Sequence, residues 1–566
     1  MEYGINHYFY VDDLKIIAET PEEALKAHNI VIEIMQALGL KINFNKCSIH
    51  ASGNIQIPEE LRHIPIITNE TPYNYLGINM TDKVMTKGVI ANIKKKVVKI
   101  MDELNKAQNS ALNYTRQIYA KIVPLINYSA ISIEWPLTEL EAINRIIRKK
   151  MTEGKMYGRC ISKYRLYLSR NRLGQGAPNV RDEYAKELFR LHVHYKWRDD
   201  PFGNALMAQN KNAQINIWKR LIKTLRNKIT CVQLQKIITD IENNPKIKTT
   251  KNKIAAANIA LAHELDNYYM GKWKEQSVAG QMARCYDSPY VDREITARAW
   301  KHFNIKRSAY MQVIRMQEGS TMNTKKALFN KDPTKKYCPI CKNKIATNAH
   351  VLLNCPISKK SQIRKHDEIA EIIYHKIESK LTMSGVHPIP HYRDECGRTL
   401  MWNKEVVARS YGPFAKRPDI FYIDGDHAAI IDVTIVSDQN IRKAYFKKVN
   451  KYKQLQETVR KYLKVKDVQI IPIVLTINGL INELSLKHLQ QIGISMRWNR
   501  IIRNLLAKNM KDIMLFNGIK IDAEIIQEND NDDNDEIEEE QLFNSHLMMI
   551  DQTHPSQIRS DNEQQE

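Results

Sequence analysis

The spacing of apolar residues predicts a small α/β unit at the start of the chain. In residues 6–18 two short apolar runs flank an acidic turn, which predicts two strands joined tightly. Thr20 precedes a proline and two glutamates, and apolar residues then recur at helical steps, so a helix is expected that ends at Gly39. Further strands are predicted at 41–45 and 73–80.

The middle of the chain, residues 84–330, has the apolar period of amphipathic helices. Long examples are 94–112, 116–126 and 139–151, and basic residues dominate their polar faces. A glycine- and proline-containing loop at 171–178 marks the clearest break inside this helical block.

From residue 361 onward the pattern becomes mixed again. It predicts helices at 361–385, 400–410 and 439–464, a hairpin over 417–436 and a strand at 467–477. The turn of the hairpin is placed at Asp424-Gly425, a favoured two-residue turn sequence. Residues 526–566 are rich in Asp, Asn, Glu and Gln and are predicted to be disordered.

Charge is divided unevenly along the chain. The net charge is +23, but residues 522–566 hold 15 acidic residues against one arginine, so the first 521 residues carry a net charge of +37. Such an excess attracts polyanions through phosphate contacts and counterion release, so nucleic acid is the expected partner. A ribosome, a membrane surface or a merely soluble basic surface are the alternatives. The acidic tail is either a solvated extension or a competitor for the basic surface.

Several classes of protein are excluded by the sequence. No apolar run approaches the about 20 residues needed to span a bilayer, and the first residues lack the layout of a signal peptide. Eight cysteines are too few and too scattered for a secreted disulfide scaffold, so a reducing compartment is expected. Because the first strand follows Met1 almost at once, we expect a truncated chain.

A Cys/His cluster lies in residues 331–360. Its spacing is Cys-x2-Cys-x8-His-x4-Cys, formed by Cys338, Cys341, His350 and Cys355. Three thiolates and one imidazole close a tetrahedral Zn²⁺ site with no position left for water, so the expected role is structural. Because the segment is too short for its own hydrophobic core, the metal would supply most of its folding free energy. The alternative is two surface cysteines beside an unrelated histidine and cysteine.

Two carboxylates are expected to meet in the predicted hairpin. Asp419 follows Pro418, and Asp432 stands in an otherwise apolar strand, so Asp432 needs a buried partner. We place the pair at a sheet edge, where it would hold Mg²⁺, polarise a scissile phosphate and lower the pKa of a bound water. Pro-Asp alone is a weak motif, because it is also common in ordinary turns.

This stretch resembles restriction-like nucleases, whose pattern is Pro-Asp…Asp/Glu-x-Lys. The position of the usual lysine is occupied by Thr434. Lys448 lies instead in the apolar stripe of the following helix, at three- and four-residue steps. We expect Lys448 to orient the attacking water or stabilise charge on the phosphorane, with Lys451 as second candidate. The alternative is a lysine whose stem only packs while its amine reaches water.

Asp12 and Asp13 form the acidic turn near the start of the chain. A hairpin tip with adjacent carboxylates is how polymerase palms present metal ligands, although an ordinary acidic turn is the alternative. Residues 10–14 resemble the third palm motif of reverse transcriptases, 39–47 resemble the fourth, and 73–77 resemble the primer-grip motif.

The order of these motifs is similar to the C-terminal part of the protein encoded by site-specific non-LTR retrotransposons with a restriction-like endonuclease. The resemblance covers residue 6 to about residue 520. It implies that Asp12 and Asp13 bind Mg²⁺, that Lys46 assists near the triphosphate, and that Tyr75 and Gly77 support the primer end.

A basic-His motif after the Cys/His cluster is also similar to one in that family. It implies that Arg364, Lys365 and His366 contact nucleic acid, and the helix with Lys448 and Lys451 matches the family's displaced lysine. The implied domains are a truncated palm at 1–83, a thumb at 84–185, a helical linker at 186–330, a CCHC zinc knuckle at 331–360, a restriction-like α/β endonuclease at 361–525 and a disordered acidic tail at 526–566.

Proteins of this family nick target DNA and extend the exposed 3′-OH by copying element RNA. The resemblance therefore implies Zn²⁺ and Mg²⁺ as cofactors, target DNA and template RNA as partners, no membrane, and a nuclear location. The earlier palm motif with a further metal-binding aspartate does not occur in the sequence, so we expect the chain by itself not to polymerise DNA. Alternatives are a catalytically inactive nucleic-acid-binding remnant and a zinc-dependent transcription factor, which a single knuckle disfavours.

Overall fold

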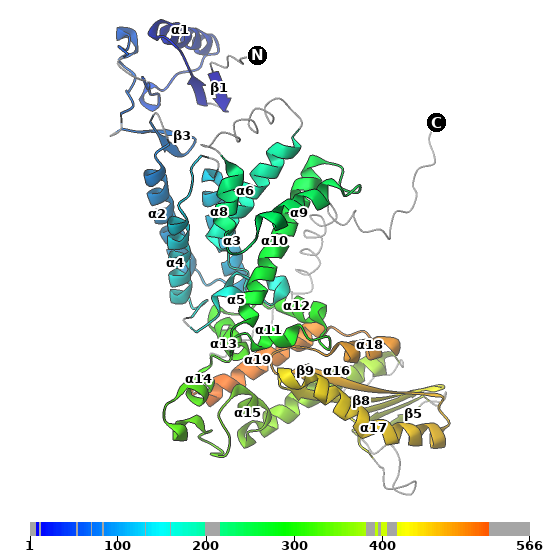
Figure 1. Cartoon of the computed structure of the whole chain (residues 1–566). Helices are drawn as coiled ribbons and strands as arrows, with labels where there is room; N and C mark the ends of the chain where they lie inside the picture. Colours follow the sequence, from blue (N-terminus) through cyan, green and yellow to red (C-terminus); the bar gives the residue numbers. More distant parts are fainter. Residues whose placement is uncertain are drawn as a thin grey trace, which may run out of the picture.

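The computed structural model places three units one after another. A small α/β unit lies at one end, a helical region in the middle, and a mixed α/β unit at the other end (Figure 1). The structure describes residues 7–10, 13–51, 55–68, 71–81, 84–130, 132–158, 160–198, 216–380, 391–393, 398–403 and 416–519. The predicted disordered tail lies outside these residues.

The first unit begins with an antiparallel pair of strands, β1 (His7–Tyr10) and β2 (Asp13–Ile16). Helix α1 (Pro21–Ala37) follows as predicted: the Thr20 side chain accepts a hydrogen bond from the Glu23 N–H, and Gly39 has a positive φ of 69° after the helix end.

Two details of this unit differ from the prediction. The strand expected at 41–45 is wrong, because this stretch runs into a 3₁₀ turn, η1 (Phe44–Lys46), and pairs with no described strand. The strand expected at 73–80 is two short strands, β3 (Tyr73–Tyr75) and β4 (Ile78–Met80). They fold back around Leu76 and Gly77, whose φ angles of 49° and 77° belong to a tight hairpin turn.

The middle of the chain is helical, as predicted. The predicted helix 94–112 is divided in two, because the Ser110 side chain accepts a hydrogen bond from the Asn113 N–H and so starts a new helix. The helices are α2 (Thr86–Lys106), α3 (Ala111–Ser129), α4 (Leu137–Glu153), α5 (Lys163–Tyr167), α6 (Val180–Trp197), α8 (Ile217–Leu225), α9 (Cys231–Glu242), α10 (Thr250–Lys274), α11 (Gln281–Tyr286), α12 (Arg293–Lys301), α13 (Arg307–Gln317) and α14 (Met322–Phe329).

The last unit contains a five-stranded sheet in the order β5-β6-β7-β8-β9. Neighbouring strands are antiparallel except β8 and β9, which are parallel and joined by helix α17. The elements of this unit are α15 (Asn348–Leu353), α16 (Lys359–Lys380), β5 (His391–Arg393), β6 (Thr399–Trp402), β7 (Ile420–Asp424), β8 (His427–Val436), α17 (Ile441–Leu463), β9 (Asp467–Thr476), α18 (Glu483–Gln491) and α19 (Trp498–Phe516).

Three predictions for this unit need correction. The helix expected at 400–410 is wrong at its start, because residues 399–402 form β6 and pair with β7, while 404–410 lie outside the described residues. Asp424 pairs with His427, so the hairpin turn is Gly425-Asp426 rather than Asp424-Gly425. Strand β8 lies inside the sheet, between β7 and β9, so Asp432 is not on an edge strand.

Helix α19 joins the last two units. It packs against α12 and α13 of the helical region and against α15 and α16 of the mixed unit (Figure 1). Its buried residues belong to one apolar core that runs from α2 to α19. Helix α17 covers one face of the sheet and forms a second, smaller core with the residues Phe421, Ile430, Tyr452, Leu455, Val459 and Val468 among its members. No helix in the described part of the chain is long and apolar enough to cross a membrane.

Candidate nuclease centre and metal site

The candidate nuclease centre forms where β7 begins, at the point where the longer β8 continues past it. The last pair of this ladder is Ile420 with Ile431, so Val433 has no strand partner on that side. Side chains take its backbone groups instead. The Val433 N–H donates to Asp419 Oδ2 at 2.7 Å, and its carbonyl oxygen lies 3.1 Å from His366 Nε2. The side chains of Asp419 and His366 therefore continue the ladder beyond the first residue of β7.

His366 links helix α16 to this position. Its Nε2 lies 3.1 Å from Asp419 Oδ2, and its Nδ1 lies 2.9 Å from the carboxylate of Asp367. The hydrogen bond to Asp419 raises the pKa of His366 to about 9, although burial opposes this rise. The ring therefore carries a positive charge at neutral pH in this arrangement.

Asp432 lies next to this group on β8 and is only 4% exposed. Both of its carboxylate oxygens accept hydrogen bonds from helix α17. Lys448 contacts Oδ1, the Tyr452 hydroxyl donates to Oδ2, and Lys451 Nζ lies 3.1 Å from Oδ2. Burial alone would raise the pKa of Asp432, but the charge and hydrogen bond of Lys448 and the Tyr452 hydroxyl outweigh burial and lower it. Asp432 is therefore held as an anion.

The structure thus brings together Asp419, Asp432, Lys448 and Lys451, which the sequence nominated for catalysis. The apolar stripe expected around Lys448 is also present, since Ile441, Tyr445, Tyr452, Leu455 and Val459 are all buried. Lys448 is the less exposed of the two lysines, at 23% against 40% for Lys451. Their catalytic roles stay a prediction.

Two members of this centre were not recognised from sequence in the role that they have here. Tyr452 belongs to the apolar stripe of α17, yet its hydroxyl reaches Asp432 and lies 3.2 Å from the Arg417 carbonyl oxygen. Its position four residues after Lys448, on the same helix face, was the available signal. His366 was assigned to nucleic-acid contact, but it lies within the carboxylate group. No local signal joins it to Asp419, because the contact connects α16 to β7.

The other residues of the basic-His motif lie elsewhere. Lys365 is 3% exposed, and its Nζ lies 2.8 Å from Asp512 Oδ2 and 2.7 Å from Asn509 Oδ1, both on α19. Its amine is therefore engaged inside the protein and is not presented to nucleic acid, contrary to the expectation. Arg364 is 68% exposed and lies 3.9 Å from Glu368, so it remains accessible.

The four predicted zinc ligands converge. One potential ligand atom from each of Cys338, Cys341, His350 and Cys355 lies within 4.8 Å of the others. The sulfur atoms of Cys338 and Cys355 are 3.8 Å apart, and Cys341 Sγ lies 3.3 Å from His350 Nε2. Two thiolates at about 2.3 Å from a tetrahedral zinc lie about 3.8 Å apart, so this cluster could hold Zn²⁺.

A buried polar network anchors residues 331–360, which carry the Cys/His cluster and are called the zinc segment below, to the helical region. The Asn348 side-chain oxygen accepts hydrogen bonds from Thr321 at 2.8 Å and Thr324 at 3.0 Å, and its amide donates to the Met316 carbonyl at 3.0 Å. Asn348 opens α15, the helix that carries His350. The segment is therefore fixed from one side by this network and from the other by its ligand cluster.

The candidate polymerase residues lie at the far end of the molecule. Asp12 lies outside the described residues, and Asp13 opens β2 in a half-buried position. Lys46 is exposed in η1, and Tyr75 lies under the Lys15 amine, 5.4 Å from its ring centre. Gly77 forms the β3–β4 turn. These residues share one unit, and their functions stay predictions.

Comparison with known proteins gives one finding for this chain. Residues 1–80 match the family model described as reverse transcriptase (RNA-dependent DNA polymerase). A search of curated proteins gives no match. The matched residues include the acidic hairpin and the two motifs that follow it, so the predicted relation to reverse transcriptases is confirmed for this stretch. The match covers a short part of the chain, and within that part it supports a function related to reverse transcription.

Proposed function

We propose that this chain nicks DNA as an Mg²⁺-dependent endonuclease attached to a reverse-transcriptase segment. The observation that supports the proposal is the convergence of two carboxylates, two lysines and a histidine where β7 begins. A structural ion pair would need one lysine for Asp432. Two lysines and a tyrosine hydroxyl around a single carboxylate favour a site prepared for a charged reaction.

The oxygen donors at this point suit Mg²⁺. The carboxylates of Asp419 and Asp432 and the Val433 carbonyl are hard oxygen ligands on neighbouring parts of the chain. They also accept hydrogen bonds from Lys448, Lys451 and His366, so Mg²⁺ has to compete with these cations. When bound, the ion would polarise the scissile phosphate and lower the pKa of a water ligand.

The side chains have separate roles in this proposal. Asp419 and Asp432 hold the cation, and Tyr452 fixes the orientation of Asp432. Lys448 orients the attacking water or stabilises the charge that develops on the phosphate, with Lys451 as second candidate. His366 positions Asp419 through its Nε2 contact. The basic surface of the helical region holds the DNA through its phosphates.

We further propose that the nick serves target-primed reverse transcription by a retrotransposon protein with target DNA and template RNA as partners. The order of the reverse-transcriptase segment, the zinc segment and the α/β unit supports this assignment. A nuclear location follows from the DNA substrate. Zn²⁺ would have a structural role in residues 331–360.

The test is the conversion of supercoiled plasmid to nicked circles by purified, zinc-loaded protein with and without Mg²⁺. Three variants are compared with the unmodified chain: Asp419→Ala, Lys448→Ala and Asp426→Ala. Asp426 is the matched control, because it lies in the turn of the same hairpin, is 54% exposed and pairs with Lys466. We expect Mg²⁺-dependent nicking that Asp419→Ala and Lys448→Ala abolish and that Asp426→Ala retains.

Equal residual cutting by the unmodified protein and Asp419→Ala would refute the nuclease assignment. DNA binding without any nicking would instead identify a nucleic-acid-binding remnant whose carboxylates no longer act. If Lys448→Ala still nicks the plasmid, Lys451→Ala is tested as a fourth variant. Loss of nicking in Lys451→Ala would then assign the catalytic role to Lys451 in place of Lys448.

A further inference from the structure

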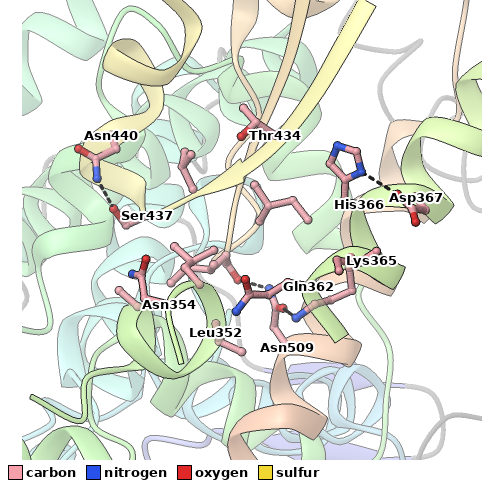
Figure 2. A pocket seen from close by; sticks show the side chains of 16 residues that line it. Leu352, Asn354, Gln362, Lys365, His366, Asp367, Thr434, Ser437, Asn440 and Asn509 are labelled. Atoms are coloured by element: carbon pink, nitrogen blue, oxygen red, sulfur yellow. Dashed lines mark hydrogen bonds and ion pairs between the residues drawn. The ribbon is translucent and has the colours of Figure 1, made fainter. Parts of the chain in front are cut away.

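A cavity of about 620 Å³ lies beside the candidate nuclease centre. Figure 2 shows the side chains that surround it, which come from α15 and its C-cap, α16, the end of β8, the turn between β8 and α17, the residue after β9, and α19. His366 and Asp367 stand on its wall, so the cavity and the carboxylate group share these residues. Its volume falls within the range of about 300–1,000 Å³ that small-molecule sites occupy.

The lining combines apolar side chains with uncharged polar ones and carries few charges. Lys365 is the one cation on it besides His366, and Asp512 and Asn509 hold its amine. The charge of His366 is balanced by Asp367 and Asp419. A phosphate would find no unpaired cation among these residues. The uncharged polar residues on the wall are Asn354, Gln362, Thr434, Ser437, Asn440 and Asn509. Asn509 is engaged at both polar ends, by Lys365 and by the Ile477 carbonyl. The amides of Gln362 and Asn440 each donate one hydrogen bond, to Ser358 and Ser437, which leaves each its second N–H.

Such a wall matches the edge of a nucleobase. An amide side chain presents a donor and an acceptor together, which is the combination that base edges offer. Apolar residues on the same wall, Leu352, Ile363 and Ile435, provide surface for the faces of the ring. Enzymes that bind a base outside the helix use the same two kinds of contact, hydrogen bonds to the edge and apolar packing on the faces.

The cavity lies close to the place where a DNA strand would be cut. Thr434 lies two residues beyond Asp432 on the same face of β8, roughly 7 Å along the strand. This length corresponds to about two stacked nucleotides. A strand whose phosphate lies at Asp419 and Asp432 would therefore bring a neighbouring base to the mouth of the cavity.

The zinc segment builds one side of the cavity. Ala349, Leu352, Leu353 and Asn354 line it, and they alternate with the ligands His350 and Cys355 along the same short stretch. Loading of the metal therefore fixes the wall that faces the nuclease. The zinc segment would therefore shape the cavity in addition to stabilising its own fold.

We propose that this cavity holds the base of one unpaired nucleotide of the DNA strand next to the scissile phosphate. The inference rests on the proposed nuclease function and adds to it a preference for DNA that is locally unpaired. A flipped base costs a few kcal/mol in a perfect duplex and much less where it is already unpaired, so such DNA binds more tightly.

The experiment measures binding of the full chain, loaded with zinc, to two fluorescein-labelled duplexes by anisotropy. One duplex carries a single bulged adenosine and the other is fully paired, and Ca²⁺ replaces Mg²⁺ to prevent cutting. We expect the bulged duplex to bind about tenfold more tightly, the lower part of what one stacked base contributes. Gln362→Trp fills the cavity and should abolish the preference, so that the two duplexes bind equally.

Two further variants complete the test. Ile372→Trp is the matched control, because Ile372 lies on the same helix, is 45% exposed and does not line the cavity. It should keep the full preference. Asn440→Ala removes one exposed amide without adding bulk, so it keeps the test valid if Gln362→Trp fails to fold. We expect it to reduce the preference about threefold, the effect of one hydrogen bond.

The outcomes separate the two proposals. Equal binding of both duplexes by a protein that nicks plasmid through Asp419 would overturn the cavity proposal and leave the nuclease intact. A preference that neither Gln362→Trp nor Asn440→Ala changes would overturn it as well. A preference lost in these variants, in a protein that never nicks, would support base binding by the cavity and refute the nuclease.

Discussion

The two acidic hairpins of this chain differ in how they are packed. Asp432 is 4% exposed, and the helix that contacts it, α17, buries five apolar residues against the sheet. Asp13 opens a two-stranded sheet, and the helix that follows it, α1, buries none of its residues. Ile34 of α1 is 51% exposed, and Leu38, which caps the helix, is 66% exposed.

The comparison shows which of the two acidic groups is held in place by the packing of the chain around it. Around Asp432 a continuous core fixes the strand and the helix that bring the lysines to the carboxylate. Around Asp13 the described residues supply only short strand pairs, which are marginally stable alone in water. Preorganisation of charge, which enzymatic sites require, is therefore found around Asp432 and not around Asp13.

Removal of zinc should produce the largest difference in stability between the two ends of the molecule. Structural zinc contributes about 10–16 kcal/mol of apparent binding free energy in small zinc domains, and here it would fix α15 beside the nuclease. We expect Cys338→Ser to lose the bound zinc and to lose hydrogen-exchange protection in α15, while β1 and β2 do not change. Cys160→Ser is the control, because Cys160 is exposed and remote from the cluster in sequence. Unchanged protection in α15 would show that the Asn348 network holds the segment without metal.

The second largest effect is expected when Asp432 and Asp13 are each replaced by asparagine, because the two hairpins should lose different amounts of stability. Asp432→Asn leaves Lys448 and Lys451 without their anion, and because these lysines keep part of their exposure we expect a loss of about 1–3 kcal/mol in the opening free energy of β8. Asp13→Asn should change the opening free energy of β2 by less than about 0.5 kcal/mol. Native-state hydrogen exchange measures both. Equal losses in the two hairpins would remove the distinction drawn above.

The two lysines should respond differently to Mg²⁺. Lys451→Met removes a cation that competes for Asp432 while Lys448 remains, so the Mg²⁺ concentration for half-maximal nicking should fall about threefold, equivalent to about 0.7 kcal/mol. Lys448→Met should abolish nicking at every Mg²⁺ concentration. A titration of plasmid nicking measures both effects. A higher Mg²⁺ requirement in Lys451→Met would show that Lys451 assists the cation or the reaction.

The smallest effect is expected on helix α1. Ile34→Gln should change stability by less than about 0.5 kcal/mol, since its side chain is half exposed in the described structure. Leu61→Gln is the contrasting variant in the same unit, because Leu61 is 4% exposed. Thermal unfolding followed by circular dichroism compares them. A loss of several kcal/mol in Ile34→Gln would reveal a partner surface that covers this face in solution.

Local patterns predicted the elements whose signals are local. The Cys/His spacing located the zinc ligands, Thr20 and Gly39 marked the ends of α1, and the apolar stripe around Lys448 located α17. In each case the residues that define the feature lie within a few turns of one another. Periodicity and caps therefore carried enough information.

Features that depend on distant partners could not be predicted in this way. Residues 399–402 form a strand because β7 pairs with them. Lys365 is buried because its amine forms an ion pair with Asp512 of α19. His366 reaches Asp419 only because α16 packs against β8 beside the start of β7. Such contacts join segments far apart along the chain, so the spacing of residues within one segment does not predict them.

Helix α19 has a consequence for the synthesis of this protein. The helices that it covers, α12, α13, α15 and α16, leave the ribosome before Trp498 is added. Their apolar faces stay exposed to water until α19 arrives, and contacts between such distant segments form slowly. A reading-frame error between Thr476, where β9 ends, and Trp498, where α19 begins, would therefore leave these four helices without the helix that packs on them, and the product would be prone to aggregate.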